Sequence, residues 1–132
     1  MTIMGVELNG SELRYVVLQY GAEGGFEIAA ANRMRLAETR SGPALSALHS
    51  AITTTLNELA PDLIAIKAKP ETGQMRAGAA ALKLEALLLA SARCDVDFVS
   101  GARVNKVDET SDDLHKYLAP AYKTALAAAA VR

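Results

Sequence analysis

The first third of the chain alternates apolar and polar residues in short stretches, as the strands of a half-buried sheet do. A short apolar run covers residues 3–8, and an alternating run covers residues 11–20. Asn9 and Gly10 separate the two runs, so we expect a type I′ hairpin turn there, because both central positions of that turn need a positive φ. A glycine-rich break follows, and residues 26–31 predict a third strand.

The apolar positions then take up a helical spacing. Leucine or isoleucine recurs every three or four residues between Leu45 and Leu59, which predicts an amphipathic helix over residues 43–59 that ends before Pro61. The continuous apolar run within residues 62–67 is typical of a strand that is buried on both faces. Residues 75–93 predict a second helix, whose later half is apolar on nearly every side.

The last part of the chain predicts one more strand, over residues 95–100, and a final helix from Pro120 through Val131. Before that helix, Ser111 and the two aspartates after it look like an N-cap and an acidic first turn.

The resulting order of elements is β-β-β-α-β-α-β-α. Right-handed crossovers would place the fourth and fifth strands parallel to the first. We therefore expect an α/β fold with a five-stranded mixed sheet and helices on both faces, formed by a single domain of residues 1–132.

The composition of the chain limits the kinds of function that we expect. Fourteen Lys and Arg stand against 15 Asp and Glu, so the net charge of −1 lacks the basic excess of a dedicated nucleic-acid binder. The single cysteine, Cys94, excludes an intrachain disulfide and CxxC metal spacing, which fits a reducing compartment. We see no signal-peptide pattern and no apolar stretch that reads as a membrane span, so we expect a cytoplasmic protein.

Two stretches of sequence resemble a known family. Residues 4–10, Met-Gly-Val-Glu-Leu-Asn-Gly, resemble the first strand of RuvC-type resolvases, which reads Gly-Ile-Asp-Pro-Gly. Residues 63–67, the polar loop after them and residues 80–85 are similar to the fourth strand and following helix of those resolvases. The Gly-Val-Glu-Leu start and the Lys-Leu-Glu-Ala helix also resemble a group of bacterial proteins of this length with no established activity. The resemblance implies an RNase H-like, RuvC-like fold over most of the chain.

The same resemblance implies what a nuclease of this type would need. Active RuvC-type enzymes hold two divalent metals with about four acids, so Mg or Mn would be the cofactor if this chain is a nuclease. Their first-strand acid falls on Glu7, which makes Glu7 the candidate catalytic and metal-binding residue. Their fourth-strand acid falls on Lys67, and their last-helix pair falls on residues 122–127, which contain Lys123 and Thr124 but no carboxylate. The metal site is therefore degenerate unless other acids substitute, with Glu85, Asp108, Asp112 and Asp113 as the candidates.

Independently of the family, the residue pattern pairs Glu7 with Lys67. Alternation puts Glu7 on one face of a strand that should be central, and a carboxylate near the core is costly unless it is paired. Lys67 ends a strand that should lie parallel and adjacent to the first. We expect the Lys67 ammonium to pair with Glu7 in the place of a metal. The alternatives are that both side chains reach solvent, or that both take part in binding or chemistry.

A local basic group follows the fourth strand: Lys67, Lys69, Arg76 and Lys83. Ligands gather at the carboxyl ends of strands in open α/β sheets, so these four residues and Glu85 are candidate ligand-binding residues. A phosphate-bearing ligand or a nucleic-acid backbone would suit them. The loop lacks the Lys-Ser/Thr of a P-loop, and a solvated loop with scattered charges remains the alternative.

The remaining candidates favour structural roles. His49, His115 and Cys94 have no partners at metal-ligand spacing, so we interpret each as a surface or packed residue. Tyr15, Tyr20 and Phe26 would suit base stacking on a sheet face, but core or hairpin packing is the better interpretation because no basic residues interleave them as a nucleic-acid surface requires.

Three functions remain open at this stage. The first is a non-catalytic binding or assembly module, expected to be a homodimer through the apolar second helix. The second is a metal-dependent nuclease on structured nucleic acid, which needs at least two carboxylates converging on Glu7. The third is a phosphate or nucleotide binder, which needs Lys69 and Arg76 to point into one pocket.

Overall fold

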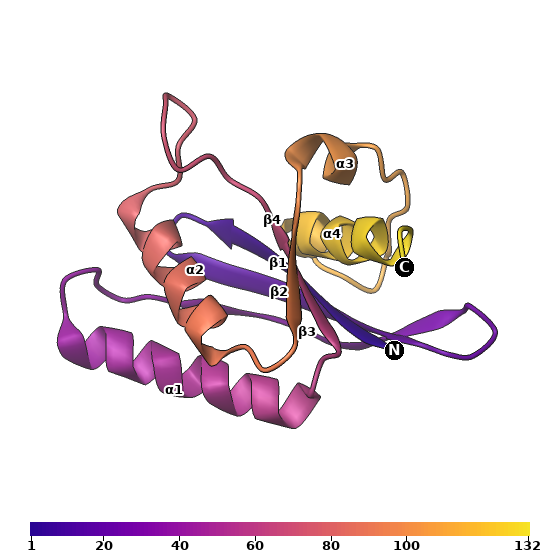
Figure 1. Cartoon of the computed structure of the whole chain (residues 1–132), viewed down its shortest axis with the longest axis horizontal. Coiled ribbons are helices and arrows are strands. Elements are labelled where there is room, and N and C mark those ends of the chain that lie inside the picture. The colour runs from indigo at the N-terminus through magenta and orange to yellow at the C-terminus, as the bar shows by residue number, and fades with distance from the viewer.

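A five-stranded sheet forms the centre of the computed structural model, which describes residues 1–132 (Figure 1). The strand order is β3-β2-β1-β4-β5, with β1 antiparallel to β2 and parallel to β4. The strands are β1 (Thr2–Asn9), β2 (Glu12–Tyr20), β3 (Phe26–Arg35), β4 (Leu63–Lys67) and β5 (Asp95–Val99). Because β4 and β5 are both parallel to β1, the predicted mixed sheet and its crossovers are confirmed.

The first hairpin has a different turn from the predicted one. Asn9 pairs with Glu12, so Gly10 and Ser11 are the two turn residues. Only Gly10 has a positive φ, at 58°, which a type II′ turn requires at its first central position. The type I′ turn at Asn9-Gly10 was therefore wrong, and this shift sets which residue of β2 lies opposite Glu7.

Helices α1 (Gly42–Leu59) and α2 (Ala79–Ser91) cover one face of the sheet (Figure 1). The Ser41 hydroxyl caps α1 by accepting from the Ala44 amide, and Ala60 ends it in the left-handed region at φ 43°. Helix α2 begins four residues later than predicted, after Gly78, because residues 75–78 remain in the loop. No helix of the chain is long and apolar enough to cross a membrane.

The opposite face of the sheet is covered by α4 (Ala119–Ala129), with the short α3 (Gly101–Asn105) beside it (Figure 1). The sequence predicted α4 but not α3 or the 3₁₀ turn η1 (Lys116–Leu118). The expected helix start at Ser111 was wrong, because the Ser111 hydroxyl accepts from the Asp113 amide within a turn and no helix follows.

Two apolar cores lie on the two faces of the sheet. The one under α1 and α2 includes Ile52, Leu84 and Leu88, and the one under α4 takes mainly alanines from that helix: Ala121, Ala125, Ala127 and Ala128. The alanines let α4 approach β1 closely: a Cβ added at Gly5 would lie 2.2 Å from the Ala121 carbonyl oxygen. This contact fixes the start of α4 over the half of β1 that leads to Glu7.

Candidate functional site

Glu7 is a buried carboxylate at the carboxyl end of the central strand. It follows Ile3 and Gly5 on the face of β1 that α4 covers, and its relative exposure is 5%. In the antiparallel register Glu7 lies directly opposite Arg14 of β2. A carboxylate in this position needs compensating charge, because desolvation strongly disfavours a lone ion.

Two cations supply that charge from the two neighbouring strands. Arg14 Nη1 lies 3.6 Å from Glu7 Oε1, and Lys67 Nζ lies 3.8 Å from Glu7 Oε2. The structure thus brings Glu7 and Lys67 together as the sequence predicted, and adds Arg14. Oε1 is buried and has no hydrogen-bond partner. The contacts are therefore ion pairs at long range, rather than the short hydrogen bonds that charged groups form when their geometry is ideal.

The ion pairs continue across the sheet to β3. Glu12 accepts from Arg14 Nε at 2.9 Å and lies 3.5 Å from Arg33 Nη1. Arg14 and Arg33 both lie over the ring of Tyr117, at 5.4 and 4.8 Å from its centroid, which is within range of a cation–π contact. His115 stacks on the same ring, with centroids 5.5 Å apart. This network ties the hairpin to the segment before α4.

Sequence reasoning missed Arg14, Glu12, Arg33 and Tyr117. A signal was present, because the predicted turn would have placed Glu7 opposite Glu12. Like charges directly opposite on a sheet are destabilising, whereas the observed register places Glu7 opposite an arginine.

These residues do not fit a divalent metal. Mg²⁺ and Mn²⁺ prefer oxygen ligands, usually including carboxylates, whereas Glu7 stands alone between two cations. No group of three or more His, Cys, Asp or Glu side chains is placed to hold a metal ion. The last-helix positions do not help: Thr124 is fully buried and its hydroxyl donates to the Pro120 carbonyl at 2.7 Å.

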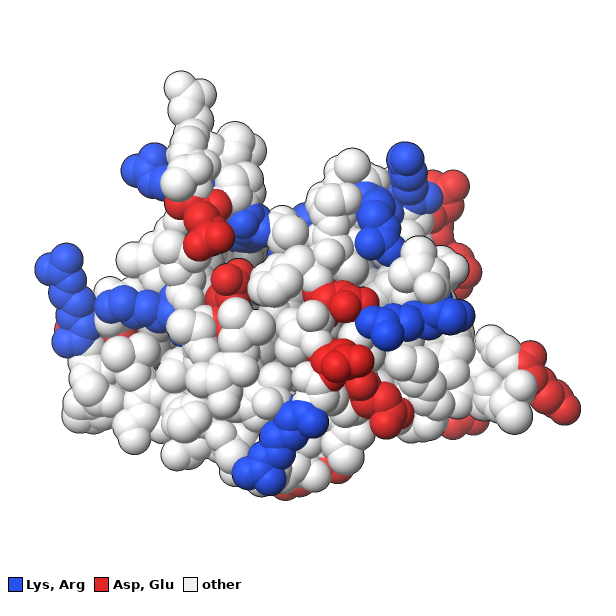
Figure 2. All heavy atoms as spheres, in the orientation of Figure 1, with Lys and Arg blue, Asp and Glu red and all other residues white.

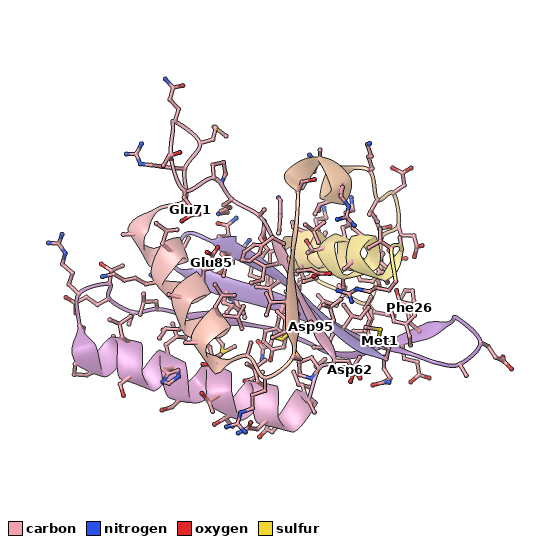
Figure 3. The ribbon with its side chains drawn as sticks, in the orientation of Figure 1. Met1, Phe26, Asp62, Glu71, Glu85 and Asp95 are labelled. Atoms are coloured by element: carbon pink, nitrogen blue, oxygen red, sulfur yellow. The ribbon has the colours of Figure 1, made fainter.

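The candidate substitute acids lie elsewhere. Glu85 is on α2, on the other face of the sheet and near Glu71 of the preceding loop (Figure 3). Burial, and then the charge of Glu71, raise the pKa of the Glu85 carboxyl above its ordinary value. Asp108, Asp112 and Asp113 are exposed in the segment between α3 and η1.

The predicted basic group divides in two. Lys83 donates to the Thr39 carbonyl oxygen, beside the start of α1, and so lies apart from Lys67. Arg76 is exposed and donates to the Gly73 carbonyl oxygen at 3.1 Å within its own loop. None of the five main pockets is lined by Lys67, Lys69, Arg76 or Lys83. The loop itself therefore offers two cations, the half-buried Lys69 and the exposed Arg76, and neither lines one of these pockets.

A basic hollow lies at the carboxyl ends of β4 and β5. Figure 2 shows a hollow between the protruding β4–α2 loop and α3, with Lys and Arg side chains on the two segments that flank it and acidic side chains at its foot beside the loop. The basic residues of these two segments are Lys69 and Arg76 in the loop, and Arg103 and Lys106 at α3; the Arg103 guanidinium donates to the Ala127 carbonyl oxygen of α4 at 3.0 Å. Sequence reasoning found the first pair only, because Arg103 and Lys106 fall in an element it did not predict. We call this surface the basic hollow.

The aromatic and thiol candidates have structural surroundings. Tyr20 packs on Phe26 with centroids 5.2 Å apart, whereas Tyr15 lies in the core on the opposite face, so the three rings form no common platform. Cys94 is half-buried, and burial followed by the charges of Asp95 and Asp62 raises the pKa of its thiol. Figure 3 shows both aspartates at that end of the sheet. A thiol of raised pKa is a poor nucleophile at neutral pH.

A family model described as "Protein of unknown function (DUF3010)" matches residues 1–128. Among curated protein sequences, none matches the chain. RuvC of Thermus thermophilus is similar in structure, with a TM-score of 0.78 and 13% identity, over 100% of this chain and 96% of that chain. The same protein in complex with a Holliday junction substrate has a TM-score of 0.79 and 14% identity over the same shares.

The fowlpox virus resolvase, in complex with Holliday junction DNA, is also similar, with a TM-score of 0.61 and 12% identity over 99% of this chain and 98% of that chain. Identities this low show the fold alone. The expected RuvC-like RNase H fold is confirmed.

Proposed function

This chain belongs to the DUF3010 family and has the RuvC-like RNase H fold, and from that premise we propose that it is a non-catalytic module that binds nucleic acid. The observation that carries the proposal is the position of Glu7 between Arg14 and Lys67, at 3.6 and 3.8 Å. Internal cations stand where a nuclease of this fold would need metal ions.

Electrostatics supports the absence of hydrolysis. Two like unit charges about 4 Å apart repel by roughly 4 kcal/mol at the effective dielectric constant of a protein surface. A divalent ion bound to Glu7 would lie close to two cations and would face a larger repulsion. Hydrolysis by two metals also needs further carboxylates. The positions that RuvC-type enzymes use hold Lys67 on the fourth strand and residues 122–127 on the last helix, which include no carboxylate.

The basic hollow supports the choice of ligand. Lys and Arg side chains at the carboxyl ends of strands, here the half-buried Lys69 and the exposed Arg76 and Lys106, suit the phosphates of a nucleic-acid backbone. Two proteins of similar structure are described in complexes with Holliday junctions, which makes a four-way DNA junction the first ligand to test. The net charge of −1 fits a local basic surface better than a general affinity for nucleic acid.

Fluorescence anisotropy with a labelled four-way junction, duplex DNA and single-stranded RNA tests the proposal. We expect wild-type protein to bind the junction at low salt, and Lys69→Ala/Lys106→Ala to weaken binding about tenfold and to lower the salt slope by about 2. Arg40→Ala/Arg93→Ala, which removes two exposed cations outside the hollow, is the matched control and should bind as wild type does. No binding, or an equal loss in both variants, would contradict the proposal.

A resolvase-like nuclease is the second candidate, because the likeness to RuvC covers the whole chain and Glu7 lies at the end of the first strand. Incubation of the same substrates with Mg²⁺ or Mn²⁺, beside Glu7→Gln and an EDTA control, separates the two functions. We expect no cleavage. Metal-dependent cleavage that Glu7→Gln abolishes, with both proteins folded, would replace the non-catalytic proposal by the nuclease.

A further inference from the structure

A second surface, opposite in charge to the basic hollow, follows the edge of the sheet. Strand β3 pairs only with β2, so the outer row of its backbone groups has no neighbouring strand. Ala29, at a bulge, has no partner on β2 either. Such an edge can pair with an added strand.

Beside this edge is a groove of about 660 Å³. Its walls come from both faces of β3 and from the segment before η1, so it runs along the edge of the strand. The apolar lining is Phe26, Ile28, Ala30, Ala31, Leu114 and Tyr122. Phe26 packs against Tyr122 with centroids 6.2 Å apart and lies next to α4 (Figure 3). The floor is therefore an anchored part of the core rather than a mobile surface.

Both charged residues that line the groove are negative. Glu27 and Asp113 line it and are both exposed. The segment 107–114 holds Asp108, Glu109, Asp112 and Asp113 with no Lys or Arg, and residues 20–32 hold no basic residue either. A nucleic-acid backbone would be repelled here. A cationic partner would be attracted. Its positive side chains would pair with the acids at the rim, and its apolar side chains would contact the apolar lining of the groove.

From these observations we propose that the β3 edge groove binds an extended, basic peptide segment of a partner protein, which adds a strand to the sheet. The backbone of the peptide pairs with the free edge of β3, and its Lys or Arg side chains meet Glu27 and Asp113. Main-chain pairing supplies affinity in this mode, and alternate side chains supply specificity. The groove along six residues of β3 would accommodate about 20 Å of extended chain.

The test uses a labelled eight-residue peptide of the repeat Lys-Lys-Val-Val, which presents Lys on both faces of an extended strand, with anisotropy as the readout. We expect wild-type protein to bind it and Glu27→Gln/Asp113→Asn to weaken binding about fivefold or more, as the loss of two surface ion pairs would. Glu38→Gln/Glu58→Gln, two exposed acids near α1, is the matched control and should leave the affinity unchanged. A peptide of the same length with Glu in place of Lys should not bind.

Strand addition has its own control, the same Lys-Lys-Val-Val peptide methylated at alternate backbone nitrogens on the pairing side. It keeps the charge but loses main-chain donors, so we expect it to bind at least tenfold more weakly. Equal binding of the methylated peptide, no binding of the parent peptide at millimolar concentration, or an equal loss in both protein variants would overturn the proposal. A dimer of the free protein that only Glu27→Gln/Asp113→Asn disrupts would overturn it too, by assigning the groove to a second copy of the chain.

Discussion

Glu7 depends on partners that come from different strands, Arg14 from β2 and Lys67 from β4. Neither contact is short, and one carboxylate oxygen has no hydrogen bond. The stability of the fold should therefore depend on both cations. If either is removed, the cost of desolvating the Glu7 carboxylate remains, but the favourable interaction with one positive charge is lost.

Lys67→Ala tests that dependence. We expect the free energy of unfolding to fall by about 1–3 kcal/mol, since Arg14 still compensates part of the Glu7 charge. Urea denaturation followed by circular dichroism measures the change. Lys69→Ala, two residues further on and outside the ion-pair network, is the control and should change stability by less than about 0.5 kcal/mol.

The double variant Glu7→Gln/Lys67→Met separates charge from packing. It removes the buried carboxylate together with its lysine partner, so it should be more stable than Lys67→Ala alone. If Lys67→Ala were as stable as wild type, the two side chains would be solvated ends rather than a pair.

Glu85 makes the free energy of unfolding depend on pH. Its pKa is raised in the folded protein, first by burial and then by Glu71, so folding favours the protonated form. Any stabilisation from that preference is full below the ordinary pKa of Glu and disappears as the pH rises through the folded value. Glu85→Gln should therefore be more stable than wild type at pH 7, by up to about 0.5 kcal/mol, with the gain shrinking below about pH 4.

Thermal unfolding at several pH values measures the Glu85 effect, with Glu38→Gln as an exposed control. A Glu85→Gln protein that is less stable at pH 7 than at pH 4, relative to wild type, would mean that the carboxylate has a favourable partner in the folded state.

Among the secondary-structure elements, the contact of α4 with β1 controls where the site forms. A Cβ at position 5 would lie 2.2 Å from the Ala121 carbonyl oxygen and 2.7 Å from the Ala125 amide, both of which are backbone atoms. Gly5→Ala should therefore lower the free energy of unfolding by about 3 kcal/mol or more, because the helix as a whole must move. Gly42→Ala, where an added Cβ meets nothing within 4 Å, should be neutral or slightly stabilising, and equal effects would rule out the close approach.

The elements that periodicity predicted are those with a continuous apolar face. Helix α1 and strand β4 appear within one residue of their predicted bounds, because burial of Leu48, Ile52 and Ile64 determines both. Prediction failed where local hydrogen bonds or loop geometry decide. The residues before α2 stay in the loop, and α3 is too short to show a repeat.

The candidate site was predicted only in part, because some of its residues follow from the order of the strands and others depend on turn geometry. Glu7 and Lys67 follow from alternation and the parallel crossover, which depend only on the sheet order. Arg14 depends on the hairpin register, and a two-residue slip in the turn would have exchanged it for Glu12. Tyr117 comes from a 3₁₀ turn more than 100 residues away in sequence, and no local pattern links it to the hairpin.

On the scale of the whole molecule, the two proposed binding surfaces differ in charge, although Glu71 of the β4–α2 loop and Glu85 lie beside the first of them (Figure 3). Cations flank the basic hollow at the carboxyl ends of β4 and β5, and acids rim the groove at the edge of β3. The two proposals together predict that one nucleic-acid ligand and one basic protein partner bind the chain at the same time. Neither surface includes the exposed side of α2, which is apolar and free for a contact that does not depend on charge.

That side of α2 is where the predicted homodimer would form. Ala86 and Leu89 are both exposed and lie one turn apart, and Leu89 is 41% exposed although it is a large apolar residue. We expect a mass of two chains at micromolar concentration, and Leu89→Glu should reduce it to one because a buried unpaired charge opposes the contact. Met75→Glu, at an exposed apolar residue in the loop, is the control and should leave the mass unchanged. Sedimentation equilibrium distinguishes the outcomes: a wild-type monomer would remove the dimer, whereas a dimer insensitive to Leu89→Glu would move the interface off α2.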